Sequence, residues 1–204
     1  MKLYYMPGAC SLAAHIVLQW LGKPYETQKM GRDELKQPAY LAINPLGAVP
    51  ALTVGDWHLT QNVAILQYLA EADPTLNLQG QNTPRAHAEV RRWLGFINAD
   101  VHKTFSLLFG AAQYVDDAAA QTALQNSASK RLTQLFKLID DQLAGQIYLT
   151  GDRKTIADAY LYVVLRWARA KKVNLDGMTN VQKFFDHMTK DAGVQTALQA
   201  EGLT

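Results

Sequence analysis

The sequence predicts an α/β unit followed by an all-helical unit, and three observations support this fold class. Over the first 78 residues, short strand-like runs alternate with helix-like runs. From residue 85 onward, the periodic stretches have the apolar spacing of helices. The polar residues 75–84 between them lack periodicity and indicate a linker. A chain of 204 residues has room for two domains, which we place at residues 1–78 and 85–204.

The first unit opens with a strand, a helix and a second strand. Lys2–Tyr5 is short, apolar and aromatic, and Pro7-Gly8 ends it. Ser11–Leu21 is apolar on nearly all sides, as in a helix buried on both faces, and Gly22 fits its C-terminal end. Residues 25–30 are the second strand candidate. A crossover through the helix would make the two strands parallel.

A hairpin and a helix complete the first unit. Residues 49–54 and 57–59 flank Gly55-Asp56, which is typical of a tight turn between antiparallel strands. The apolar residues 63, 66 and 70 then recur at helical spacing. We expect Thr60 to cap this helix and Asp73-Pro74 to end it.

The second unit contains three long apolar stripes at helical spacing. They cover residues 90–101, 132–143 and 156–167. Thr155 and Asp158 resemble a capping box at the start of the third stripe. Shorter helices are expected over residues 181–190 and 194–199.

Composition excludes several functional classes. Lys plus Arg is 20 and Asp plus Glu is 18, so nucleic acid is a poor candidate for a partner. A single cysteine excludes an intramolecular disulfide and a zinc site of several thiolates, and the five histidines have no metal-ligand spacing. The first residues have no apolar signal region, and no apolar run is long enough to span a membrane. We therefore expect a cytoplasmic protein with neither metal nor membrane partner.

Cys10 lies where the first strand gives way to the first helix. Free N–H groups and the helix dipole at such a position favour an anion, so a thiolate would be stabilised there. A lone cysteine is equally often a buried structural residue. Ser11 could donate a hydrogen bond to a sulfur at the same helix end, or it could simply begin the helix.

Two further polar segments in the first unit could contact a ligand. Residues 44–50 contain two prolines and one glycine, and Pro50 could follow a cis peptide bond that exposes the Val49 backbone to an extended ligand. Gln61 and Asn62 could bind a carboxylate at a helix N-terminus. An ordinary loop and an ordinary polar helix start remain the alternatives.

One polar segment of the second unit could reach the same ligand. His102 and Lys103 end the first apolar stripe, and Asp100 precedes them. A histidine beside a lysine could polarise a substrate or stabilise a thiolate. A solvent-facing histidine near a bend in the helix remains the alternative.

Five segments, taken together, resemble the bacterial beta-class glutathione S-transferases of the cytosolic superfamily. They are MKLYYMPGACSL at residues 1–12, NPLGAVP at 44–50, VAI at 63–65, DVHK at 100–103 and TIADAY at 155–160. They fall in the family's order and span almost the whole chain. The resemblance implies a thioredoxin-like N-terminal domain, an all-helical C-terminal domain and a homodimer.

The resemblance also implies roles for residues of the first domain. The Val49-Pro50 bond would be cis, and the Val49 backbone would pair with the cysteinyl backbone of glutathione. Gln61 and Asn62 would hold the γ-glutamyl end. Cys10 would contact the glutathione sulfur and could form a mixed disulfide with it.

The remaining implied contacts come from the second domain and from loops. His102 and Lys103 would project towards the sulfur, and Asp100 would reach the glutathione of the partner subunit. Lys36 is a possible match for a basic loop residue. The chain departs from the family in having Gln61-Asn62 in place of an acidic residue followed by a small one, and Leu46 and Gly95 where the class often has Lys and Asn.

We therefore expect a detoxification enzyme that uses glutathione as co-substrate, needs no metal and conjugates glutathione to small hydrophobic electrophiles. Cys10, Ser11 and His102 are the expected catalytic residues. The electrophile would bind in an apolar cleft between the domains, and the helical domain would provide the dimer contacts. One alternative is a glutathione-dependent thiol–disulfide oxidoreductase that uses Cys10 in a monothiol cycle. Another is a non-catalytic binding module of the same fold.

Overall fold

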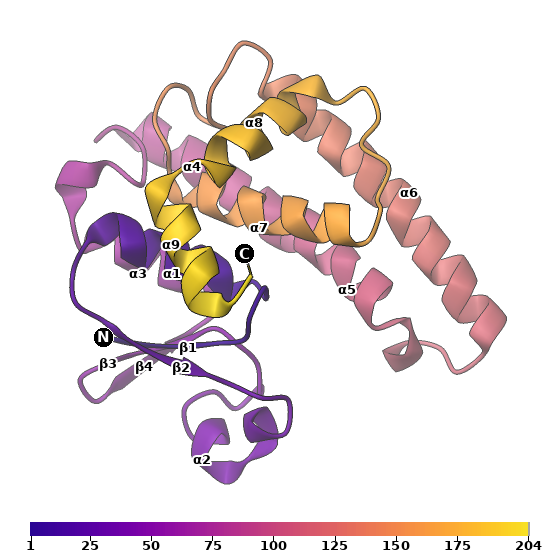
Figure 1. Ribbon diagram of the computed structural model, residues 1–204, viewed down its shortest axis with the longest axis horizontal. Helices are drawn as coiled ribbons and strands as arrows, with labels where there is room; N and C mark the ends of the chain where they lie inside the picture. The colour runs from indigo at the N-terminus through magenta and orange to yellow at the C-terminus, as the bar shows by residue number, and fades with distance from the viewer. Residues whose placement is uncertain (204) are drawn as a thin grey trace.

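The computed structural model describes residues 1–203 and contains a small sheet with helices on both faces, followed by a group of helices (Figure 1). The strand order is β2-β1-β3-β4. As expected, β1 pairs with β2 in parallel and with β3 antiparallel, and β3 and β4 form a hairpin. The strands are β1 Lys2–Tyr5, β2 Glu26–Lys29, β3 Ala51–Val54 and β4 Trp57–Thr60.

Helices α1 and α3 cover one face of the sheet, and α2 lies on the other (Figure 1). The α2 side has a small buried cluster in which Tyr4 packs against Tyr40. As expected, Gly22 ends α1 in the left-handed conformation that glycine adopts easily, with φ 61°. The elements are α1 Ser11–Leu21, η1 Glu34–Lys36, α2 Pro38–Leu41 and α3 Asn62–Glu71.

The second unit is helical, as the sequence predicts. The apolar stripe at residues 90–101 continues from α4 into a π-helix, η3, and ends beside α5. The capping box of Thr155 and Asp158 is present at the start of α7. The elements are η2 Pro74–Leu76, α4 Pro84–Phe96, η3 Ile97–His102, α5 Lys103–Phe109, η4 Ala111–Gln113, α6 Ala118–Gln142, α7 Ile156–Ala170, α8 Thr179–Thr189 and α9 Ala192–Glu201.

Helix α1 joins the two units into one hydrophobic core. It packs against β1 and α3 on one side and against α7 and α9 on the other, which explains its apolar surface all round. This architecture is a thioredoxin-like sheet domain with an all-helical partner. A division at residues 75–84 stays a prediction, because one continuous core crosses it.

The start of α3 differs from the expectation. Thr60 does not cap the helix, because it ends β4 and pairs with Ala51 in the sheet. Gln61 is the N-cap instead, and its φ is 70°. A non-glycine residue at positive φ is strained, and such strain is concentrated at functional sites.

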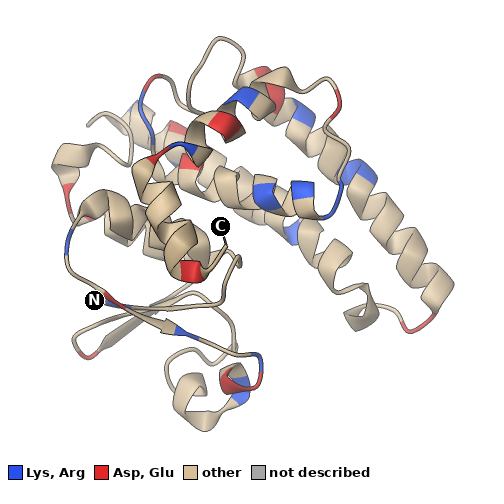
Figure 2. Cartoon of the chain, viewed as in Figure 1, with Lys and Arg blue, Asp and Glu red and all other residues tan. Residues whose placement is uncertain are grey.

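Charged residues of both signs are interspersed over the helices, and blue residues gather towards the end of α7 in Figure 2. Arg166 and Arg169 lie in this last part of α7, and Lys171 and Lys172 follow it. Cations at this end complement the helix dipole. Among the helices of residues 1–203, none is both long enough and apolar enough to cross a membrane.

Candidate functional site

The thiol of Cys10 lies against the loop that leads into β3. Cys10 is the N-cap of α1, and its thiol donates to the Val49 carbonyl oxygen at 3.5 Å. The Val49-Pro50 peptide bond is cis, as the family resemblance implies. The fold therefore brings together two residues that are 39 positions apart and that both belong to the predicted glutathione site.

Cys10 differs from the expected thiolate. Burial raises the pKa of its thiol to about 12, and the backbone N–H groups of Cys10 and Ser11 offset only part of that effect. The helix N-terminus thus acts in the expected direction, but desolvation is the larger effect. In the ligand-free protein Cys10 is a neutral S–H group that can donate a hydrogen bond.

Ser11 is too deeply buried for its side chain to contact a substrate directly. It is fully buried, and its hydroxyl both accepts from the Met6 N–H and donates to the Met6 carbonyl, each at 3.3 Å. These bonds close the turn between β1 and α1. The geometry favours the interpretation that Ser11 begins the helix, over the catalytic role expected from the sequence.

Hydrogen bonds from two helices of the second unit fix the turn before Cys10. The Gly8 N–H donates to Glu201 of α9 at 2.9 Å, and the Gly8 carbonyl accepts from Trp167 of α7 at 2.7 Å. Glu201 is itself buried and lies 2.9 Å from Nδ1 of His15. The sequence reveals none of these contacts, because they join residues more than 150 positions apart.

Asn62 has an unsatisfied amide in the described structure. It is 6% exposed at the first position of α3, and neither Nδ2 nor Oδ1 has a hydrogen-bond partner among residues 1–203. An unpaired buried polar group costs about 1–3 kcal/mol, so a ligand that satisfied it would recover that energy. The neighbouring Gln61 is exposed.

His102 reaches the interface between the units and contacts a tyrosine there. Its Nδ1 lies 2.5 Å from the hydroxyl of Tyr160 on α7, and its ring packs edge-on against Trp167. Burial and then the charge of Lys103 lower the pKa of His102 to about 4. His102 is therefore uncharged near neutral pH. Any stabilisation of a thiolate by His102, which the sequence suggests, would have to come from the neutral ring and not from a positive charge.

Tyr160 connects the histidine to other polar residues. Its hydroxyl donates to Oδ1 of Asn98 at 3.1 Å, and the ring is fully buried. Burial raises the pKa of this hydroxyl, and the nearby Cys10 thiol raises it further. The polar Asn62 side chain close by offsets part of the rise, although the two groups do not reach hydrogen-bond geometry. Tyr160 thus lies among Cys10, Asn62, Asn98 and His102. Its spacing on α7 predicts only a core residue.

The other predicted contacts lie at the surface. Lys36 is exposed at the end of η1, and Lys103 is exposed at the start of α5. Neither lysine makes an ion pair within residues 1–203. Asp100 is half-buried on η3. Two of the departures from the family also lie at the surface, since Leu46 is 72% exposed and Gly95 is exposed on α4.

An aromatic wall borders His102. Trp167 packs edge-on against His102, Phe105 and Phe109, with ring centroids 4.8, 5.4 and 5.5 Å apart. Phe109 is 47% exposed, and the Lys171 ammonium lies 5.4 Å from its ring centre. This wall could hold a flat apolar molecule beside the polar residues of the site.

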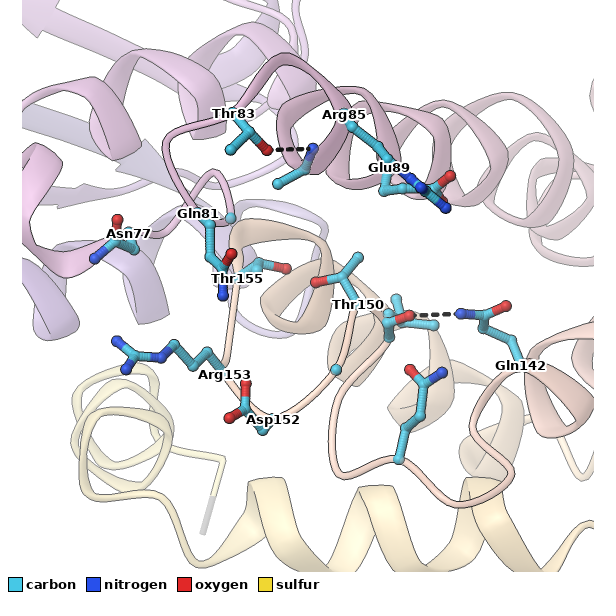
Figure 3. Close-up of a pocket in the computed structure, with 15 residues that line it drawn as sticks. Asn77, Gln81, Thr83, Arg85, Glu89, Gln142, Thr150, Asp152, Arg153 and Thr155 are labelled. Atoms are coloured by element: carbon cyan, nitrogen blue, oxygen red, sulfur yellow. Dashed lines mark hydrogen bonds between the residues drawn. The ribbon is translucent and has the colours of Figure 1, made fainter.

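A separate cavity of about 420 Å³ lies between the residues after α3 and the connection from α6 to α7 (Figure 3). Its lining includes none of the residues that the sequence predicts for the site. In Figure 3, Arg85 and Glu89 lie together on one side, while Arg153 lies beside Asp152 on the other. The two arginines therefore do not converge on one anion. Within residues 1–203, no three His, Cys, Asp or Glu side chains gather as a metal site.

Comparison with known proteins yields two family models. The glutathione S-transferase N-terminal domain matches residues 1–71, and the C-terminal domain matches residues 96–191. The protein named Glutathione S-transferase GST-4.5 from Xanthomonas campestris pv. campestris is 48% identical over 203 residues, covering 100% of both chains. Glutathione S-transferase GstA from Escherichia coli is 38% identical over 212 residues, again covering 100% of both.

Solved structures agree with these sequence matches. The glutathione S-transferase from Xylella fastidiosa is similar with a TM-score of 0.96 and 46% identity, covering 100% of this chain and 99% of that one. A bacterial beta-class enzyme from Sphingomonas chungbukensis has a TM-score of 0.88 and 31% identity, covering 100% of both chains.

Proposed function

Because this chain belongs to the glutathione S-transferase family, we propose that it binds glutathione along Val49, Gln61 and Asn62 and transfers its thiolate to small hydrophobic electrophiles. Membership of the family supports the transferase activity. The contacts and burial of individual residues support the choice of site residues and of the electrophile class.

The unsatisfied amide of Asn62 is the observation that supports this site most strongly. It occupies the first position of α3, where free backbone N–H groups and the helix dipole favour a carboxylate. The γ-glutamyl end of glutathione carries both a carboxylate and an ammonium, so it could pair with both halves of the amide. The polar group that is costly in the free protein would then be satisfied in the complex.

Activation of the glutathione thiol is the second part of the proposal. A free thiol has a pKa of about 8.5, and lowering it to about 6.5 requires roughly 2.7 kcal/mol of thiolate stabilisation. The neutral Cys10 thiol can donate one hydrogen bond to the glutathione sulfur, and the N-terminus of α1 adds its dipole. A hydrogen bond to a charged group contributes about 1.5–3 kcal/mol, so these two effects are of the required size.

The aromatic wall of Trp167, Phe105 and Phe109 would bind the second substrate. Phe109 is half-exposed, so the wall is open to a ligand. Stacking against such rings favours a flat, electron-poor electrophile. We propose activated aryl compounds as the class to test.

Binding and turnover can be tested together. We expect the wild-type protein to be retained on immobilised glutathione and to conjugate an activated aryl halide. Asn62→Leu should weaken glutathione binding at least about fivefold, since an amide with two hydrogen bonds is lost. The exposed Asn82→Leu is the control and should bind normally. Retention without any turnover would instead favour a binding module.

Thiol–disulfide exchange is a second candidate, favoured by the position of Cys10 beside Val49. The raised pKa of Cys10 opposes it, because only a thiolate attacks a disulfide. Incubation with glutathione disulfide followed by intact-protein mass spectrometry tests this reaction. A rapid, stoichiometric adduct at Cys10 near neutral pH would support exchange, and no adduct would exclude it.

We also propose a cytoplasmic homodimer, as the family resemblance implies. In that assembly Asp100, which is half-buried on η3, would approach the glutathione of the second protomer. Light scattering of the purified protein tests the assembly. A mass of one chain at micromolar concentration would contradict it.

A further inference from the structure

We propose that Tyr160 and Asn98 set the tautomer of His102, so that the neutral ring carries its proton on Nδ1 and presents a free lone pair on Nε2 to the glutathione thiol. The tautomer is a property of the ligand-free protein. Its catalytic consequence rests on the proposed function. Tyr160 and Asn98 act through His102 and are positioning residues.

The Tyr160 hydroxyl has a single proton to donate. That proton points to Oδ1 of Asn98, at 3.1 Å. An amide oxygen has no proton to donate, so Tyr160 must be the donor of this bond. Nδ1 of His102 lies 2.5 Å from the same hydroxyl oxygen. Since the phenolic proton is already used, Nδ1 must supply the proton between these two atoms.

The ring protonation follows from this chain of hydrogen bonds. His102 is uncharged near neutral pH, so it holds only one ring proton. With that proton on Nδ1, Nε2 is a hydrogen-bond acceptor. Within residues 1–203, the described hydrogen bonds of His102 use Nδ1 and leave Nε2 for a substrate.

The surroundings hold the ring in place. Trp167 packs edge-on at 71° to the imidazole and is itself anchored by its bond to the Gly8 carbonyl. Tyr160 is fully buried on α7, so its hydroxyl has little freedom to turn elsewhere. Trp167 and Tyr160 thus hold the ring at the interface between the two units, where Trp167 also anchors the turn before Cys10.

This tautomer assigns a direction to proton transfer. The glutathione S–H would donate a hydrogen bond to Nε2. As the sulfur forms its bond to the electrophile and the leaving group departs, the proton would pass to that nitrogen, giving the thioether and an imidazolium whose Nδ1–H still bonds to Tyr160. The low pKa of His102 then favours release of the Nε2 proton to water. The charge of Lys103 acts on the ring, and the Cys10 thiol lies near Tyr160. Cys10 would then donate to the same sulfur from which His102 accepts.

The tautomer can be measured directly by long-range ¹⁵N–¹H NMR of the histidine rings in the ligand-free protein. His102→Gln assigns the signal. We expect the wild type to show a protonated Nδ1 and an unprotonated Nε2. Asn98→Asp keeps an acceptor for Tyr160 and should preserve this pattern. Asn98→Ala frees the tyrosine proton to face Nδ1, so it should shift the ring towards the Nε2–H form. Asn98 is exposed, so these variants leave the core intact.

Tyr160→Phe tests the consequence for catalysis. Loss of the hydroxyl should shift the tautomer towards Nε2–H and lower kcat at least about tenfold, with KM for glutathione within about twofold. Tyr162→Phe is the matched control, because Tyr162 is equally buried on α7 and its hydroxyl contacts only Thr189 in the described structure. It should change neither quantity.

Three results would overturn the inference. They are a wild-type ring protonated on Nε2, an unchanged tautomer in Tyr160→Phe, and an equal loss of kcat in Tyr162→Phe. A protein that does not bind glutathione would contradict the proposed function. It would leave the tautomer inference untouched, because the NMR measurement is made without ligand.

Discussion

The thiol of Cys10 donates to the carbonyl oxygen of Val49, at 3.5 Å. These two groups are the sulfur and the backbone acceptor that the family resemblance assigns to glutathione, and in the free protein they are partners of each other. A ligand N–H that took the Val49 carbonyl would release the thiol as a donor. In the proposed complex, glutathione would pair its cysteinyl backbone with Val49 and would gain the Cys10 thiol as a hydrogen-bond donor to its sulfur.

Substitution of Cys10 distinguishes a donor from a nucleophile. If the thiol acts by donating a hydrogen bond, Cys10→Ser should keep kcat for conjugation within a few fold, while Cys10→Ala should lose roughly tenfold, since about 1.5 kcal/mol of thiolate stabilisation disappears. Steady-state kinetics with an activated aryl halide measure both. An equal and complete loss in both variants would show a nucleophilic role instead.

The raised pKa of Cys10 predicts low reactivity at neutral pH. A pKa of about 12 lies above that of a free thiol, so the neutral form dominates up to strongly alkaline pH. The rate of alkylation by iodoacetamide in the ligand-free protein should stay low and keep rising beyond pH 9. A plateau reached below pH 8 would contradict the neutral thiol. Free cysteine under the same conditions is the reference.

Asn62 should improve ligand binding at the expense of stability. Asn62→Leu removes a buried unpaired amide and keeps the side-chain shape, so the free protein should be as stable as the wild type or up to about 1 kcal/mol more stable. Glutathione affinity should fall in the same variant. Urea unfolding with and without glutathione measures both effects. A destabilised variant with unchanged affinity would mean that Asn62 has a structural role only.

Glu201 should link the last helix to the turn before Cys10. Glu201→Ala removes the acceptor of the Gly8 N–H and leaves His15 without its buried partner, so unfolding should be easier by about 3 kcal/mol. The surviving folded enzyme should also have a lower kcat, because the turn that positions Cys10 is loosened. Glu89→Ala, which breaks an exposed pair with Arg92, is the control and should cost less than about 1 kcal/mol. Equal effects of the two variants would contradict the link.

Sequence patterns predict the backbone of this fold well because each signal is local. The hairpin at Gly55-Asp56 and the capping box of Thr155 and Asp158 involve residues close together in the chain, and both are present. The expected cap at Thr60 is wrong, because pairing in the sheet extends through that residue.

The site is harder to predict because its contacts are distant in sequence. Tyr160 has the spacing of a core residue, and its hydroxyl bonds to His102, 58 positions away. Glu201 and Gly8 are 193 positions apart. Family resemblance selects Cys10, Val49 and Asn62 as candidates. It does not reveal that Cys10 is a neutral thiol, because that depends on desolvation in the folded protein.

In the proposed function, Cys10, His102 and the N-terminus of α1 together activate the thiol of bound glutathione. The most direct test is a pH titration of the thiolate absorbance of glutathione bound to the enzyme, compared with glutathione free in the same buffer. We expect an apparent pKa for the bound thiol of about 6.5, roughly two units below the free value. A bound thiol that still titrates near about 8.5 would contradict it.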